Sequence, residues 1–435
     1  MGCENCSNNK ALDVKEPKND IIKQIDEFKN KQNENKIIIY NTKEIININT
    51  NENKKYNNIN EENYNNKNAN QIILRNNKFS YQNNLNNNNN ENNKNFILNY
   101  KSEDNLKITE NIRINILKTL NKEELKKLVL NLPKREQTKL NDFKEHLKKE
   151  TQRKNEFEKA YILFYWMHEN IEYDTIGFRT GKMEVTPEVV YSKGRGVCSG
   201  YSRLFKFLSD YIGIKVFCID GYSKGFGYYE GKKFNDINHE WNVLEVNNNY
   251  FFIDATWGAG NVNNNYIYEK NLEEFYFLPS PQEFIFSHFP KEGNWQLLDI
   301  IYTLNDFTQW INFNFNFFNF FNLPNNWKDN IPVSNRYILK LSKKNNKCIN
   351  LFTNVYFLEN NIYYENKGCK VLIQYRNNYI YFILLFQFIG KYKFKIFGSY
   401  KDDENDPIYK YLTSYHFICN TNLDYINFFF GTRRA

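Results

Sequence analysis

The apolar side chains between residues 198 and 253 follow first the period of a helix and then that of strands. After Cys198, apolar residues recur three or four positions apart and so predict one buried helix face. They are Tyr201, Leu204, Phe205, Leu208, Tyr211 and Ile212. Gly213 predicts the end of this helix. Strands are predicted over residues 214–220, 240–246 and 250–253, and the last two form a hairpin that turns through residues 247–249, all of them Asn.

A second group of strands is predicted beyond residue 300. Five segments rich in Tyr, Ile, Val and Phe alternate with clusters of Asn or Gly. They are residues 336–341, 349–357, 370–375, 379–386 and 392–397. Their spacing favours a small antiparallel β-sandwich of the immunoglobulin-like type. The Asn/Phe run at residues 312–322 is interpreted as the connection to this sandwich or, alternatively, as a strip that binds a partner.

The N-terminal part of the chain has a different composition. About a third of the first 100 residues are Asn, and such a polar tract buries too little apolar surface to offset its ordering entropy. We expect residues 1–95 to be a disordered, Asn-rich, low-complexity tail with a short helix over residues 20–31. The rest of the chain is divided into a core domain with preceding helices, residues 96–300, and the C-terminal sandwich, residues 301–435.

The net charge of +8 raises the question of a nucleic-acid partner. Between residues 118 and 154, however, the lysines alternate with glutamates, which predicts the solvated faces of helices. The sequence has no zinc-ligand spacing, no phosphate-binding glycine loop and no calcium loop of the Asp-x-Asp-x-Asp-Gly type. We therefore expect no nucleic-acid partner, no metal and no cofactor.

Cys198, His239 and Asp254 are the residue types of a thiol active site. A thiol ionises more readily at a helix N-terminus beside an imidazolium, and Cys198 follows two loop glycines, Gly194 and Gly196, and opens the predicted helix. His239 and Asp254 are 15 positions apart around the predicted hairpin. This odd separation places both side chains on one sheet face if the loop has two or four residues, whereas an unbulged three-residue loop would split them. Asp254 could then hold one imidazole nitrogen and leave the other for Cys198.

Neighbouring residues could shape this site. Trp241 and Trp257 either shield a thiolate–imidazolium pair from water or fill the seam between hairpin and helix, and the second role is favoured. Asn242 either assists the imidazole or caps the strand edge. The cysteines that lack such a context are predicted to be small buried hydrophobes: Cys218, Cys348, Cys369 and Cys419. The remaining histidines are expected to be structural, with no partner that the sequence identifies: His146, His168, His288 and His416.

Six stretches of the sequence match the pattern of a known family. They are residues 164–174, Gly196-Val-Cys198-Ser-Gly-Tyr201, residues 221–225, His239-Glu-Trp241-Asn242, residues 254–260 and residues 288–298. Over residues 155–300 the chain resembles the transglutaminase-like domain of the kyphoscoliosis peptidase family, within the papain-like cysteine peptidase superfamily. The resemblance implies an α+β core in which a helix carries the nucleophile Cys198. An antiparallel sheet carries His239 as general base and acid and Asp254 as the residue that orients the imidazole.

The resemblance also implies an activity. The superfamily cleaves protein amide bonds through a thioester, which water resolves by hydrolysis or an amine resolves by cross-linking. Many family members are cytoskeletal or division-site scaffolds and several lack the triad, so a scaffold without activity is the alternative, and the partner is expected to be a protein substrate or a cytoskeletal protein. All three residues are present here, which favours an enzyme. The second oxyanion donor is not evident, and Tyr173, Tyr191 and the Gly196 backbone are candidates.

The N-terminus carries a signal for lipidation. Gly2 suits N-myristoylation, while Cys3 and Cys6 could be palmitoylated, although Cys6 stands where Ser or Thr is favoured. Two lipids anchor a protein stably, whereas one anchors it weakly. Seven cysteines without paired spacing and no apolar signal peptide indicate a reducing cytosol. We expect a cytoplasmic, peripheral membrane protein held by its N-terminal lipids.

Overall fold

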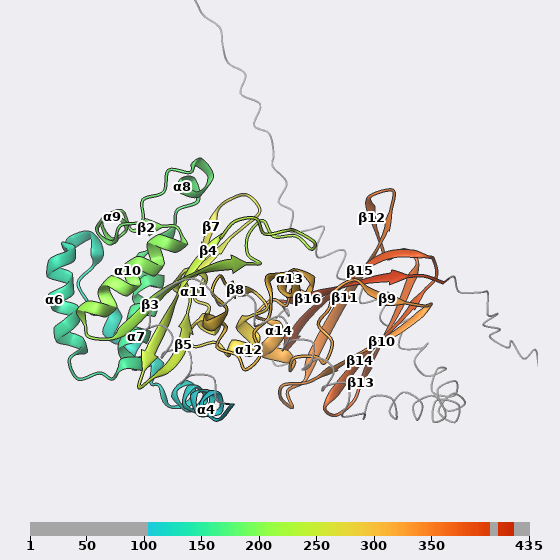
Figure 1. The fold of residues 1–435 in the computed structure, drawn as a ribbon, viewed down its shortest axis with the longest axis horizontal. Coiled ribbons are helices and arrows are strands. Elements are labelled where there is room, and N and C mark those ends of the chain that lie inside the picture. Colours follow the sequence, from blue (N-terminus) through green and yellow to red (C-terminus); the bar gives the residue numbers. More distant parts are fainter. Residues whose placement is uncertain (1–102, 401–407, 422–435) are drawn as a thin grey trace, which may run out of the picture. The chain divides into compact units, whose positions relative to one another are not determined.

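The structure is a computed structural model that describes residues 103–400 and 408–421 (Figure 1). The expected N-terminal tail, its short helix over residues 20–31 and the lipidation residues Gly2, Cys3 and Cys6 lie outside the described residues. The chain is a mixture of helices and several β-sheets. Among the described residues, none of the helices combines the length and the apolar character that crossing a membrane requires.

Helices precede the first large sheet. They are α4 (Glu103–Thr119), α5 (Lys122–Leu130), α6 (Leu140–Thr151), α7 (Glu156–Asn170), α8 (Thr175–Thr180) and α9 (Pro187–Lys193). Helix α7 begins with a capping box in which Asn155 and Glu158 bond each other's backbone N–H groups. Its residues from Tyr161 to Phe164 are all buried, which makes α7 the central helix. In α5 and α6 only one stripe is buried, so the lysines and glutamates form the solvated faces that their alternation predicted.

A four-stranded antiparallel sheet lies against these helices (Figure 1). Its strands are β3 (Lys215–Ser223), β4 (His239–Val246), β5 (Asn249–Ile253) and β8 (His288–Pro290), in the order β5-β4-β3-β8. Helix α10 (Cys198–Tyr211) packs on β3 and β4, and α7 packs on α10 and on α11 (Ala255–Ala259). Two small pairs flank the sheet: β1 (Glu172–Tyr173) with β2 (Arg195–Gly196), and β6 (Gly260–Val262) with β7 (Tyr268–Lys270).

The hairpin between β4 and β5 has a two-residue turn. Val246 pairs with Asn249, so only Asn247 and Asn248 form the loop, with φ angles of 50° and 61°. Asn tolerates this left-handed conformation better than most residues, and two such residues in succession match the twist of a hairpin. The expectation that Asn249 belongs to the turn is wrong, because it is the first residue of β5. The loop length is one of the two that keep His239 and Asp254 on one face.

The C-terminal strands form two sheets. The strands are β9 (Ile331–Val333), β10 (Arg336–Ser342), β11 (Ile349–Glu359), β12 (Ile362–Glu365), β13 (Cys369–Tyr375), β14 (Tyr379–Phe386), β15 (Gly390–Tyr400) and β16 (Lys410–Cys419). The orders are β12-β11-β15-β16-β9 and β10-β14-β13, antiparallel except for the parallel pair β16–β9. The five strands predicted from the sequence are β10, β11, β13, β14 and β15. Both sheets contribute to one hydrophobic core, and the immunoglobulin-like topology stays a prediction.

The segment between the two parts is largely buried. It contains three short helices, α12 (Pro281–Phe284), α13 (Leu304–Gln309) and α14 (Phe317–Phe320). Five phenylalanines of the Asn/Phe run lie in the core of the C-terminal sheets: Phe313, Phe317, Phe318, Phe320 and Phe321. The alternative that this run is an exposed partner-binding strip is therefore wrong, because its aromatic side chains are already occupied by internal packing.

Candidate active site

Cys198 is the first residue of helix α10 and is partly buried. The preceding loop turns at Gly194, whose φ of 64° lies in the left-handed region that glycine adopts without strain. The N–H groups of the first helical turn have no acceptor within the helix, and Val197 before it provides no side-chain cap. Cys198 therefore lies at the positive end of a 14-residue helix.

His239 lies between Cys198 and Asp254. It is the first residue of β4, and its Nε2 is 2.6 Å from Oδ2 of Asp254. Cys198 lies near the same ring and helps to raise the pKa of the imidazole. Because the ionised carboxylate can only accept, Nε2 carries a proton for Asp254 and Nδ1 is left for the thiol. The structure thus brings together the three residues that the sequence singled out.

Asp254 is held from both of its oxygens. It is fully buried and caps the N-terminus of α11, where its Oδ1 accepts the N–H groups of Thr256 at 2.8 Å and Trp257 at 3.0 Å. Asp254 is the single residue between strand β5 and α11, which is the N-cap position of the helix. Both N–H groups fix the rotation of the carboxylate, so Oδ2 is directed at the imidazole.

The charges of His239 and Asp254 stabilise each other. Burial alone would lower the pKa of His239, but the charge of Asp254 and the hydrogen bonds to Asp254 and Cys198 raise it well above its usual range. Burial would raise the pKa of Asp254, and the charge and hydrogen bond of His239 lower it well below its usual range. The site therefore holds an imidazolium beside the sulfur of Cys198 at neutral pH.

A second histidine binds the same carboxylate. His288, on β8, has Nε2 3.0 Å from Oδ2 of Asp254, and its Nδ1 is 2.8 Å from Oγ of Ser287. The ring is fully buried and stacks on Phe284 with centroids 3.9 Å apart. Burial lowers its pKa to about 4, so it is neutral at pH 7 and donates Nε2–H to Asp254.

The sequence identified no partner for His288, and the structure provides one in Asp254. It also provides partners for two further histidines, because Nδ1 of His168 lies 3.1 Å from the carbonyl oxygen of Ala259 and Nδ1 of His416 lies 2.9 Å from Asp329. The signal for His288 was its place in the last stretch of family resemblance. Its strand has only three residues, which is too short for a period to predict which face it occupies.

Two tryptophans contact the imidazoles. The Trp241 ring is 5.8 Å from that of His239 between centroids, and Trp257 is 5.5 Å from His239 and 4.4 Å from His288. Trp241 is almost completely buried and Trp257 is partly buried. Both indoles pack beside the sheet against the imidazoles, and shielding of a thiolate–imidazolium pair by them stays a prediction.

Asn242 links helix α10 to strand β3 through side-chain hydrogen bonds. Its Nδ2 donates to the carbonyl oxygens of Ser202 at 3.1 Å and Phe217 at 3.3 Å, which joins α10 to β3. Neither bond involves the imidazole of His239. Asn242 lies inside β4, paired with Cys218 of β3 and Ile253 of β5, so the expectation that it caps a strand edge is wrong.

The candidates for a second oxyanion donor differ in position. The hydroxyl of Tyr191 donates to the carbonyl oxygen of Thr138 at 3.1 Å, and its ring packs on Trp166. Burial raises the pKa of Tyr173, and this residue pairs with Gly196, two residues before Cys198. Tyr173 is therefore the better placed of the two side chains.

The cysteines outside the site are not all buried. Cys419 is fully buried, whereas Cys218 and Cys369 are intermediate and Cys348 is exposed. The prediction that all four are buried hydrophobes is therefore wrong for Cys348. Its exposure makes it a reference for an ordinary surface thiol.

His239, Asp254 and His288 are also a potential metal-binding group, because their ligand atoms all lie within 4.8 Å of one another. Two atoms bound to one tetrahedral zinc ion at about 2.1 Å are separated by ~3.4 Å. The observed separations of 2.6 and 3.0 Å are those of hydrogen bonds. The residues as placed fit a hydrogen-bonded relay better than a metal centre.

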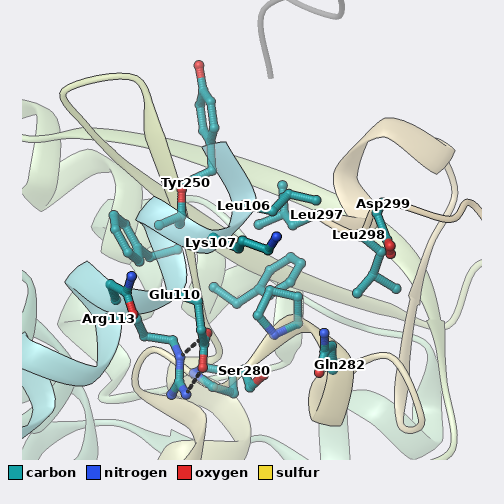
Figure 2. A pocket seen from close by; sticks show the side chains of 16 residues that line it. Leu106, Lys107, Glu110, Arg113, Tyr250, Ser280, Gln282, Leu297, Leu298 and Asp299 are labelled. Carbon is teal, nitrogen blue, oxygen red and sulfur yellow. Dashed lines mark hydrogen bonds and ion pairs between the residues drawn. The ribbon is translucent and has the colours of Figure 1, made fainter. Parts of the chain in front are cut away.

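A cavity of about 550 Å³ lies away from these residues (Figure 2). Helix α4, strand β5 and residues 279–282 and 297–299 line it, and Cys198, His239 and Asp254 do not. On its wall the two oxygens of Glu110 bind the guanidinium of Arg113, at 2.6 and 2.7 Å. The cavity is therefore not part of the candidate site.

Comparison with known proteins locates the similarity in this region. Residues 145–255 match the model of the transglutaminase-like superfamily. Human kyphoscoliosis peptidase is 31% identical over 155 residues, which are 35% of this chain and 23% of that protein. Hillarin of Drosophila melanogaster is 33% identical over 129 residues, 26% of this chain and 16% of its own length. Cytokinesis protein 3 of Schizosaccharomyces pombe is 25% identical over 136 residues, 31% and 15% of the two chains.

The matched region contains Cys198, His239 and Asp254. The chain therefore carries a transglutaminase-like domain with a mixed α and β fold. Within that class it is similar to the kyphoscoliosis peptidase family, as the sequence motifs predicted. The chain spans less than a quarter of the length of these curated relatives.

Proposed function

We propose that this protein is a cysteine-dependent acyl-transfer enzyme that acts on protein amide bonds through a thioester on Cys198. One observation carries the proposal: a buried imidazole is hydrogen-bonded to Asp254 at 2.6 Å, and the nearby thiol of Cys198 helps to raise the pKa of this imidazole. An imidazole so held keeps a proton beside the sulfur, which is what a thiolate nucleophile requires. The position of Cys198 at a helix N-terminus supports the same proposal.

The reaction follows from these positions. The thiolate sulfur of Cys198 attacks the carbonyl carbon, the C–N bond breaks, and the imidazolium of His239 gives its proton to the leaving nitrogen. The acyl group is then held as a thioester. Neutral His239 next takes a proton from water or from an amine, which attacks the thioester carbonyl. A carboxylic acid or a new amide leaves, and the thiolate–imidazolium pair is restored.

Hydrolysis and cross-linking share every step up to the thioester. The word peptidase in the names of the relatives that are 31% identical favours hydrolysis, and the name cytokinesis protein 3 favours a role at the cytoskeleton or cell cortex. We propose hydrolysis as the principal outcome and a cytoskeletal protein as the substrate. The competing functions are cross-linking and an inactive scaffold.

One experiment separates these functions. The full chain is incubated with β-casein and a biotinylated primary amine, with Cys198→Ala as the control, and the products are identified by mass spectrometry. New peptide termini that depend on Cys198 support hydrolysis, while incorporation of the amine supports cross-linking. If neither product depends on Cys198, the scaffold function is favoured.

We also propose that N-terminal lipids hold the protein on a cytoplasmic membrane face. The proposal depends on Gly2, Cys3 and Cys6 in the sequence. Metabolic labelling with myristate and palmitate analogues tests it. Label on the wild type that is lost in Gly2→Ala, together with release from membranes, is the expected result, and an unlabelled wild type would refute the anchor.

A further inference from the structure

Exposed apolar side chains concentrate on three segments of the transglutaminase-like part. Between residues 103 and 300, eleven large apolar side chains are exposed, and eight of them belong to residues 176–183, 226–237 and 266–267. We call these eight the apolar rim. They are Ile176, Phe178, Met183, Phe226, Tyr229, Ile237, Tyr266 and Ile267. A cluster of this kind marks an interaction surface more often than scattered single residues do.

The three segments contact one another. The ring of Phe226 lies 5.0 Å from that of Tyr266 between centroids, and the guanidinium of Arg179 lies 5.4 Å from the Tyr266 ring. Helix α8, which carries Phe178 and Arg179, and the β3–β4 and β6–β7 connections lie on the same side in Figure 1. The rim is therefore one surface built from helix α8 with the residues after it and from two strand connections.

The rim reaches the candidate active site from two sides. On one side Phe178 lies 6.1 Å from the ring of Tyr173, and Tyr173 pairs in the β1–β2 sheet with Gly196, two residues before Cys198. On the other side Gly225, next to Phe226, leaves no room for a side chain, because a Cβ there would be 2.5 Å from the Trp257 ring. That ring in turn lies 5.5 Å from His239. The apolar surface is thus continuous with the residues on either side of the thiol–imidazole pair.

The exposure of these side chains is large. Phe178 is 46% exposed, Phe226 43% and Tyr266 42%, although each has a packing partner. The ring contacts within the protein bury only part of each side chain. The rest of its apolar surface is exposed to water, and a bound apolar partner would gain free energy by covering it.

We propose that the apolar rim is the substrate-docking surface, and that it selects an extended protein segment with aromatic or aliphatic side chains next to the reacting amide. The proposal rests on the proposed function. Its occupant follows from the continuity of the rim with Cys198, since a segment bound there brings its own carbonyl to the sulfur. The segment is extended because an amide inside a helix or sheet is not accessible to a nucleophile.

The test compares probes of different size. Iodoacetamide reaches the thiol without needing the rim, whereas a peptidyl chloromethyl ketone must lie along it. Two such ketones are used, one with a Phe-Leu-Phe peptide and one with a Ser-Asn-Ser peptide. The rate of covalent modification of Cys198 in the full chain is measured by peptide mapping.

The variants Phe178→Ser and Phe226→Ser each remove one large side chain from a different segment of the rim. Ile300→Ser is the matched control, because Ile300 is 48% exposed and lies outside the rim. We expect the apolar ketone to react about 10-fold faster than the polar one, and each rim variant to lose most of that advantage. The iodoacetamide rate stays unchanged in all three variants.

Equal rates for the two ketones, or rim variants that behave like Ile300→Ser, would refute the docking surface while leaving the thiol chemistry intact. Slow and unselective reaction of Cys198 with iodoacetamide would instead refute the proposed function, and this proposal with it. Two further measurements identify another occupant. If the rim variants lose binding to phosphatidylserine vesicles, or change the oligomeric state in sedimentation, without changing the ketone rates, the rim serves a lipid surface or a second copy and the proposal is wrong.

Discussion

His288 donates its Nε2–H to Oδ2 of Asp254 across 3.0 Å, and this is the same oxygen that binds His239 at 2.6 Å. The carboxylate therefore accepts two imidazole N–H groups on Oδ2 and two backbone N–H groups on Oδ1. A carboxylate with four donors has one orientation and a firmly retained charge. His288 therefore positions Asp254 for His239 without contacting the thiol.

Replacing His288 tests this positioning role. In His288→Phe the Oδ2 atom loses one donor, and we expect alkylation of Cys198 at pH 6 to slow by about 10-fold. His288→Gln keeps an N–H donor and should remain within about 3-fold of the wild type. The control is His146→Gln, because His146 is exposed on α6. Equal rates for the Phe and Gln variants would show that the hydrogen bond does not position the site.

The same histidine makes the fold sensitive to acid. Burial lowers the pKa of His288 from 6.5 to about 4, so between these values the unfolded chain binds a proton that the folded protein does not. Stability is therefore full above pH 6.5 and falls as the pH drops towards 4, by roughly 3 kcal/mol from this group alone. His239 has the opposite pH dependence. Its pKa is raised in the folded protein, so its contribution to stability is full at low pH and is lost as the pH rises above the ordinary pKa of a histidine.

Urea unfolding at pH 7 and pH 4.5 measures this effect. The wild type should lose more free energy of unfolding between the two values than His288→Gln, which has no titrating group at that position. Parallel losses in the two proteins would mean that His288 is not held neutral in the folded state.

The close packing of helix α11 against helix α7 leads to a third prediction. A Cβ at Gly258 would overlap the ring of Phe164 on α7, and α11 begins at the residue after Asp254. We expect Gly258→Ala to destabilise the protein by about 1–3 kcal/mol through overpacking and to slow alkylation of Cys198, because α11 shifts with its cap.

A double-mutant cycle identifies the cause. Phe164→Leu shortens the side chain that meets the new methyl group, so the combined loss of stability should be smaller than the sum of the two single losses. If the two losses of unfolding free energy simply add, the destabilisation by Gly258→Ala does not arise from its contact with Phe164.

Local patterns predicted the centre of the site. The period of apolar residues after Cys198 predicted α10. The odd separation of His239 and Asp254 predicted a shared face only for a loop of two or four residues, and the two-residue loop of the structure meets that condition. The period of a helix and the alternation of side chains along a strand involve residues that are close in the sequence, so one sequence is sufficient to predict them. The turn itself was predicted one residue too long, since Asn is compatible with both a turn and a strand edge.

Non-local packing was not predictable in this way. His288 reaches Asp254 from 34 positions further along the chain, on a strand whose pairing with Ser223 depends on the course of the intervening loops. The phenylalanines of residues 312–322 alternate with Asn, a pattern that is equally compatible with a surface strip and with a buried connection. Only the arrangement of the C-terminal sheets decides between the two.

The central claim is that His239 and the helix N-terminus activate Cys198, and alkylation by limiting iodoacetamide between pH 5 and 8 tests it most directly. The exposed thiol of Cys348 in the same chain is the internal reference, and His239→Ala is the variant. We predict that Cys198 reacts at least ~10-fold faster than Cys348 at pH 6, keeps this advantage at pH 5, and loses it in His239→Ala. Reaction of Cys198 no faster than that of Cys348, with the same pH dependence in wild type and variant, would contradict the account.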